Sequence, residues 1–233
     1  MGAAPQPQAL PGWYGKLPFL GDFAGRRLPP TFIGTWDDWL QSVIHGSRGT
    51  LGEESWLQNY LSSPIWHFCL APGVCGNNAW FGLIMSSVDR ANRHFPFTIA
   101  YGVEREALHD VSLASMVDWL RTLEGEAVAM LDLEGSVQAV EDRLAGYAPP
   151  AGLDDTRPRV AEDLSNYLDH ALHVPATEVA ALLAAIAEQA TRGKGDEISL
   201  WWTSADEQGQ SAVVRACKGL PSAETYTAML TGA

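Results

Sequence analysis

The chain has 233 residues, of which 46% are hydrophobic and 18% charged, an ordinary composition for a soluble globular protein. The formal net charge of −13 is uneven, because residues 1–110 carry nine acidic and seven basic side chains and residues 111–233 carry nineteen acidic and eight basic ones. A negative surface repels phosphate backbones and anionic lipid. We therefore expect this protein to bind neither nucleic acid nor a membrane.

The cysteines and the apolar runs indicate the compartment. Cys69, Cys75 and Cys217 form no CxxC and no paired spacing, which suits a reducing environment. The N-terminal sequence lacks the basic and apolar regions of a signal peptide. The most apolar run, residues 179–187, is flanked by glutamates and is too short to span a bilayer. A cytoplasmic protein is therefore expected.

The first regular element predicted is an amphipathic helix over residues 32–44. Residues 1–11, rich in Pro, Ala and Gln, precede it and are expected to be disordered. The apolar face of the helix consists of Trp36, Trp39, Leu40 and Val43, at the spacing of one helical stripe. We expect this stripe to pack into the core. A second short helix is predicted over residues 53–61.

Three strand-like runs follow the two helices. They span residues 65–70, 79–86 and 95–103. The first run is apolar on both faces, as expected of a buried central strand. The connections between the runs are too short for parallel crossovers, which need a dozen residues or more, so the three strands should pair antiparallel.

The remainder of the chain is mostly helical in pattern. Helices are predicted over residues 108–123, 136–144, 163–170, 177–191 and 221–230. Two further strands, 198–203 and 211–217, form a hairpin, and the Pro-rich stretch 147–158 is a candidate internal linker.

Two strands alone make a marginal sheet, so we expect the hairpin to join the three earlier strands. The predicted fold is α/β (α+β), a three-layer α/β/α sandwich with a mixed, largely antiparallel sheet. Residues 12–233 would then form a single domain, the alternative being two domains split near residue 150.

Two irregular segments concentrate glycine, proline, aromatic and charged residues: 12–23 and 87–98. Loops on a rigid scaffold are where binding function gathers. In a structural interpretation Lys16 pairs with Asp22, Phe23 fills the core, and Asp89 accepts backbone N–H groups in its turn.

Local architecture explains the glycines, prolines and phenylalanines of these segments better than it explains three cations. The candidate partner-contact residues are Lys16, Asp22, Asp89, Arg90 and Arg93. For these charges, structural ion pairs and partner recognition both stay open.

No arrangement required by a known chemistry is found in the sequence. There is no GxxxxGK[ST] loop, no GxGxxG and no GxSxG. His170 and His173 could share a helix face, but no HExxH or cysteine cluster accompanies them. We expect a binding protein without cofactor or metal rather than an enzyme. The alternative is an enzyme that binds a small molecule or phospho group around Lys16, Asp22, Arg90 and Arg93.

A series of short motifs carries a family resemblance. They are GKLP at 15–18, GDF at 21–23, RLP at 27–29, the helix with Trp36 and Trp39, PIW at 64–66, LAPG at 70–73, WFG at 80–82, SVDR at 87–90 and FPFT at 95–98. In this order, over residues 12 to about 103, the chain resembles the TagF family, also called ImpM, accessory proteins of bacterial type VI secretion systems. Asn92 departs from the family pattern DRxGR. Asparagine tolerates the left-handed conformation that glycine would adopt there, so the turn should survive.

The resemblance implies a cytoplasmic, non-enzymatic regulator. Members of this family are thought to repress type VI secretion after translation by interacting with the forkhead-associated scaffold protein. That function is an expectation from the resemblance and does not follow from composition or periodicity.

Overall fold

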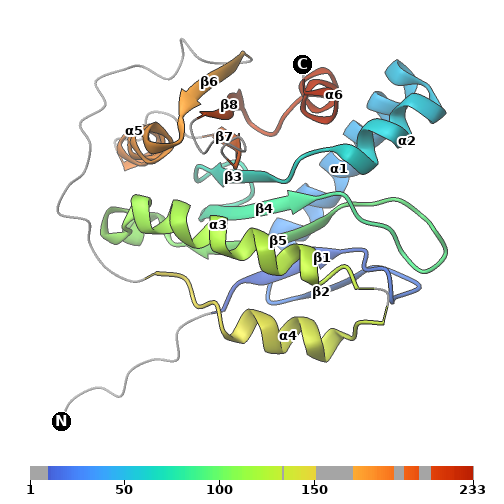
Figure 1. The fold of residues 1–233 in the computed structure, drawn as a ribbon. Helices are drawn as coiled ribbons and strands as arrows, with labels where there is room; N and C mark the ends of the chain where they lie inside the picture. The colour runs from blue at the N-terminus through green and yellow to red at the C-terminus, as the bar shows by residue number, and fades with distance from the viewer. Residues whose placement is uncertain (1–9, 133, 151–169, 192–196, 205–210, 233) are drawn as a thin grey trace.

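In the part of the chain that the structure describes, eight strands form one sheet (Figure 1). The computed structural model describes residues 10–132, 134–150, 170–191, 197–204 and 211–232. The strands are β1 (Gly12–Gly15), β2 (Ala24–Arg26), β3 (Trp66–Leu70), β4 (Ala79–Met85), β5 (Phe97–Val103), β6 (Ala171–Pro175), β7 (Ile198–Thr203) and β8 (Ser211–Lys218). Their order is β2-β1-β5-β4-β3-β7-β8-β6.

Strands from the two halves of the chain meet at the centre of this sheet. β3 pairs with β4 on one side and with β7 on the other, so that Phe68 lies opposite both Gly82 and Trp201. The C-terminal hairpin β7–β8 therefore joins the earlier strands, as the sequence predicts. Every described pairing is antiparallel, whereas a mixed sheet was expected.

Helices cover both faces of the sheet, which confirms the three-layer sandwich. One face packs against α1 (Pro30–Leu51), α2 (Glu53–Ser62) and α6 (Ala223–Thr231). The other packs against α3 (Leu113–Ala129), α4 (Val137–Ala145) and α5 (Val179–Thr191). Figure 1 shows α3 in front of the strands and α1 behind them. Short 3-10 turns, Arg105–Asp110 and Ala176–Glu178, precede α3 and α5.

The apolar stripe of α1 lies in an aromatic core, as the periodicity predicts. The Trp36 ring lies 4.7 Å from Trp39 and 4.9 Å from Phe68, and Phe68 lies 5.3 Å from Trp201. The indole N–H groups are satisfied: Trp36 donates to Thr98 Oγ1 at 3.0 Å, and Trp39 donates to a backbone carbonyl at 2.7 Å. The buried apolar area of these rings stabilises this layer, and each indole N–H keeps a hydrogen-bond partner when it is buried.

Three strands were absent from the prediction: β1, β2 and β6. β1 reads Gly-Trp-Tyr-Gly, and two glycines in four residues give no local preference for a strand. Its partner β5 supplies that preference through the register Trp13 opposite Ile99. His173 lies in β6, so placing it on a helix with His170 was wrong. Three predicted segments lie mostly outside the described residues: the helix 163–170 except its last residue, most of the linker 147–158 and nearly all of 1–11.

Candidate functional site

The two irregular segments meet at one end of the β1–β5 pair. Gly15, the last residue of β1, lies opposite Phe97, the first residue of β5. The backbone N–H of Arg90 donates to the carbonyl of Leu20 at 2.8 Å. The chain therefore brings residues 16–23 and 86–96 together as one surface, which we call the motif-loop surface.

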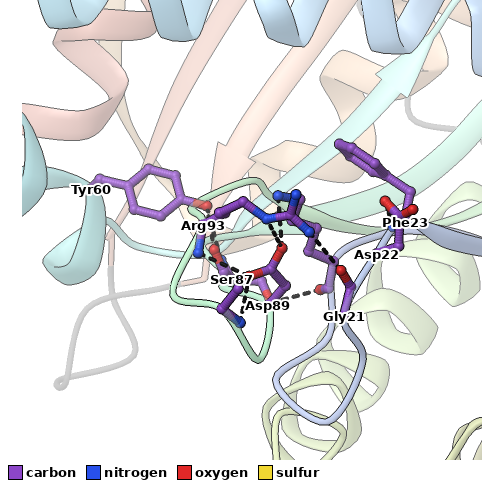
Figure 2. A network of polar contacts seen from close by, with 9 residues as sticks. Gly21, Asp22, Phe23, Tyr60, Ser87, Asp89 and Arg93 are labelled. Atoms are coloured by element: carbon purple, nitrogen blue, oxygen red, sulfur yellow. Dashed lines mark hydrogen bonds and ion pairs between the residues drawn. The ribbon is translucent and has the colours of Figure 1, made fainter.

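The Asp89 carboxylate is the centre of this surface. Oδ1 accepts the backbone N–H groups of Ala91 and Arg93, both at 2.9 Å. Oδ2 lies 3.0 Å from Lys16 Nζ and accepts from Arg93 Nε at 2.7 Å. Figure 2 shows Arg93 reaching past Asp89 to the Gly21 carbonyl, a 2.5 Å hydrogen bond, while Asp22 and Phe23 lie to one side. One carboxylate thus closes its own turn and ties the two segments together.

These contacts also set the ionisation of Asp89. Burial by itself would raise the pKa of this carboxyl. The backbone N–H of Arg93, the Lys16 ammonium and the Arg93 guanidinium together outweigh burial and hold the pKa of Asp89 well below its usual range. Lys16 is only 5% exposed, so its buried ammonium depends on the ionised Asp89 carboxylate as a counter-charge.

A second set of hydrogen bonds anchors the surface to α2. The Ser87 hydroxyl donates to the Lys16 carbonyl at 2.7 Å. The Tyr60 hydroxyl donates to the Ser87 carbonyl at 2.9 Å and accepts the Ser87 N–H at 3.0 Å. Burial raises the pKa of Tyr60 well above its ordinary value, so its hydroxyl keeps the proton that it donates. Tyr60 gave no signal in the sequence beyond its place on the predicted helix.

Two backbone positions depend on residue type. Gly15 has φ of 136°, and a Cβ there would lie 2.1 Å from the Pro96 carbonyl oxygen, so a side chain cannot be accommodated. Asn92 has φ of 59°, which is the left-handed conformation expected where the family pattern has glycine. The substitution therefore keeps the turn.

The outer part of the motif-loop surface is aromatic and charged. Phe23 is 43% exposed and was wrongly expected to fill the core. Its ring stacks on Tyr14 at 5.9 Å and meets the edge of Phe95 at 4.7 Å. The Lys16 ammonium lies 5.0 Å from the Phe23 ring centre, a cation–π distance. An exposed aromatic side chain is therefore held in one position by its neighbours.

The five predicted site residues separate into two groups. Lys16 and Asp89 are buried and pair with each other, so the expected Lys16–Asp22 pair does not form. Asp22 is exposed and accepts the N–H of Phe23 at 2.8 Å. Arg93 is half-exposed while it pairs with Asp89, and the Arg90 side chain, among the described residues, has no hydrogen-bond or ion-pair partner.

An open hollow borders the motif-loop surface. Pro18, Phe19, Asp89, Arg90 and Glu134 contribute to its lining. Of the four residues proposed for an enzyme site, Arg90 lines this hollow and Lys16, Asp22 and Arg93 do not. Among the described lining residues Arg90 is the one cation, and the Glu134 carboxylate lines the same hollow, which does not favour a phosphate. The alternative enzyme site gains no support from this geometry.

The described residues contain neither a candidate metal cluster nor a helix that could span a membrane. No group of three or more His, Cys, Asp or Glu side chains that could hold a metal occurs among them. No described helix is long and apolar enough to cross a membrane.

Comparisons with known proteins agree with the motif order. Residues 12–147 match the model of the TagF N-terminal domain, described as type VI secretion system-associated. The crystal structure of PA0076 from Pseudomonas aeruginosa PAO1 is similar, with 36% sequence identity, a TM-score of 0.67, and coverage of 96% of this chain and 94% of that chain. The comparison with curated protein sequences found no match. The chain therefore belongs to the TagF family of type VI secretion system-associated proteins.

Proposed function

We propose that this protein restrains type VI secretion after translation, and that it does so in the cytoplasm by binding the forkhead-associated scaffold through the motif-loop surface. One observation supports this proposal most: two segments far apart in the sequence form one surface, and buried ion pairs and hydrogen bonds hold them together. Arg93, for example, donates to Gly21 across a separation of 72 residues.

The surface has the properties of a preorganised binding site. Aromatic and arginine side chains contribute most to the affinity of typical interfaces. Phe23 is exposed yet packed against Tyr14 and Phe95, so binding would cost little side-chain entropy. Arg90 has no described partner to give up when it meets a carboxylate on the scaffold.

The predicted site residues take different roles in this proposal. Lys16 and Asp89 are too deeply buried to touch a partner, so they hold the two loops together. Asp22, Arg90 and Phe23 are exposed and would make the contacts. Arg93 would act in both ways, because its side chain is 56% exposed while it pairs with Asp89.

The test is binding of the purified scaffold to variants of the full chain, measured by calorimetry. Phe23→Ala and Arg90→Glu should each weaken binding at least about tenfold, as expected for interface hot spots. Val128→Ala and Arg121→Glu are the matched controls, since both side chains are exposed on α3. Equal affinity of all four variants would place the contact elsewhere. Failure of the unaltered protein to bind the scaffold would overturn the proposed partner.

A test in the host addresses the direction of regulation. Deleting the gene should raise secretion while the transcripts of the secreted proteins stay unchanged, and excess protein should lower secretion. If secretion falls on deletion, the protein is needed for assembly of the secretion system instead.

In this proposal the protein acts by binding and catalyses no reaction. We expect no phosphatase, hydrolase or nucleotidase turnover from the purified chain. Phosphatase turnover that disappears in Asp22→Ala would contradict this and favour the enzyme alternative.

A further inference from the structure

A second polar cluster lies on the sheet face that packs against α3 and α5. His67 in β3 is 1% exposed and points to the same side as Cys69, whereas Trp66 and Phe68 point to the α1 layer. Its Nε2 lies 3.1 Å from Oε2 of Glu124 on α3. The Ser204 hydroxyl, just after β7, donates to the same carboxylate oxygen. A histidine, a carboxylate and a hydroxyl thus meet in an otherwise apolar layer.

Glu124 supplies a carboxylate to this cluster. Burial alone would raise the pKa of this carboxyl, but the adjacent His67 ring and the hydrogen bond from Ser204 outweigh burial and lower it. Glu124 is therefore ionised at neutral pH. Of the two neutral imidazole tautomers, the one with its proton on Nε2 avoids placing a nitrogen lone pair against the Glu124 carboxylate 3.1 Å away, and in that tautomer Nδ1 is a hydrogen-bond acceptor.

Both ring nitrogens of His67 are buried and neither makes a hydrogen bond to a described residue, although Nε2 has the Glu124 carboxylate beside it and Nδ1 has no such neighbour. A buried polar atom without a partner is costly, and most such atoms in native proteins are satisfied. The remaining residues of β3 are Trp, Phe, Cys and Leu, so an apolar side chain would suit this position on packing grounds. Packing alone therefore does not explain why this position holds a histidine.

A cavity of about 360 Å³ opens onto this cluster. His67 and Trp202 line it from the sheet, and Val117 and Val179 line it from α3 and α5. Apolar surface predominates, and the polar lining residues include Asp118 and Arg121 besides His67; an apolar cavity with some polar groups is the usual make-up of a small-molecule site. The volume lies in the range of such sites. This cavity is separate from the motif-loop surface, whose residues do not line it.

We propose that this cavity binds a small uncharged molecule with a hydroxyl group on an apolar body, the hydroxyl donating to Nδ1 of His67. Glu124 and Ser204 are positioning residues that hold the imidazole tautomer. An anionic ligand is disfavoured because the Glu124 carboxylate lies beside the ring and because Arg121, a cation of the lining, already pairs with Asp118. The valines and the Trp202 ring contact the apolar body.

The test uses the full chain with three probes of similar shape: benzyl alcohol, toluene and benzoate. Binding is followed by the ¹⁵N shifts of labelled histidine rings and by tryptophan fluorescence. Benzyl alcohol should bind roughly tenfold more tightly than toluene, as one added hydrogen bond allows, and benzoate should bind more weakly than benzyl alcohol. The His67 Nδ1 resonance should move with benzyl alcohol alone.

Two variants separate the proposed hydrogen bond from simple filling of a hole. His67→Leu should lose the preference for benzyl alcohol over toluene, and the exposed His109→Leu should keep it. Ala180→Leu, which narrows the cavity from α5, should weaken the binding of both benzyl alcohol and toluene. The proposal is overturned if benzyl alcohol shows no saturable binding, or if His67→Leu binds both probes as the unaltered protein does.

Discussion

The motif-loop surface and the His67 cluster both bury ionisable side chains, but they satisfy them to different degrees. Asp89 accepts from four donors, and each donor belongs to one of the two loops that it joins. His67 has Nε2 3.1 Å from a Glu124 oxygen, but neither of its ring nitrogens makes a hydrogen bond to a described residue. A fully satisfied buried charge stabilises architecture, whereas an incompletely satisfied polar group beside a cavity indicates a place for a ligand.

Removing the Asp89 side chain should have the largest effect on stability of the changes considered. Asp89→Ala leaves the Lys16 ammonium buried without its counter-charge and frees two backbone N–H groups. Breaking a buried pair from one side costs about 3–5 kcal/mol, so the free energy of unfolding should fall by that amount. Urea unfolding measures it. A loss below about 1 kcal/mol would mean that water reaches Lys16 and that the pair behaves as a surface ion pair.

Truncating Phe95 tests the apolar support of the same surface. The Phe95 ring is 5% exposed and packs on Phe23 and Tyr14. Phe95→Ala should lower the free energy of unfolding by about 3 kcal/mol, through lost burial and the cavity left behind. Scaffold binding should weaken as well, since Phe23 loses its neighbour. The matched control is Phe23→Ala, which should weaken binding with a much smaller loss of stability.

The pH dependence of stability should follow the same carboxylate. The native pKa of Asp89 is lowered relative to the unfolded chain, so its contribution is complete above about pH 4, the ordinary range of an aspartate. The contribution is lost progressively as the pH falls toward the native pKa. Urea unfolding of the unaltered protein and of Asp89→Asn, compared from pH 7 to 3, isolates the contribution of the Asp89 charge to the free energy of unfolding. A constant difference between the two proteins across that range would contradict the assignment.

Replacing His67 should have a smaller effect, which sharpens the contrast with Asp89. His67→Leu removes a contact to Glu124 but also removes two buried ring nitrogens that make no hydrogen bond to a described residue. These effects oppose each other, so the free energy of unfolding should change by less than about 1 kcal/mol. A loss comparable to that of Asp89→Ala would show that the His67–Glu124 pair is a structural ion pair.

The smallest stability effect is expected for Arg90. Its side chain is exposed and unpaired among the described residues, so Arg90→Glu should change the free energy of unfolding by no more than about 0.5 kcal/mol. Arg93→Glu should cost more, because it places a carboxylate beside Asp89. Thermal unfolding measured alongside scaffold binding distinguishes the two. If Arg90→Glu unfolds the protein as Phe95→Ala does, this arginine is structural and the contact surface lies elsewhere.

The sequence pattern was sufficient for elements whose periodicity is strong. The apolar stripe of Trp36, Trp39, Leu40 and Val43 predicted both α1 and its buried face. The two hairpin strands near residues 200 and 214 were also predicted, together with their place in the larger sheet. Strands β1, β2 and β6 were not, because short or glycine-rich segments take their conformation from the strands beside them.

For the site, the sequence by itself determined which residue types are present and that Asp89 would cap its own turn, because those contacts are local. The tertiary structure decided which charges pair. Lys16 meets Asp89 rather than Asp22 because the β1–β5 register sets the two loops side by side, and a register between distant strands depends on the whole sheet. His67 likewise meets Glu124 and a cavity only because α3 packs against β3.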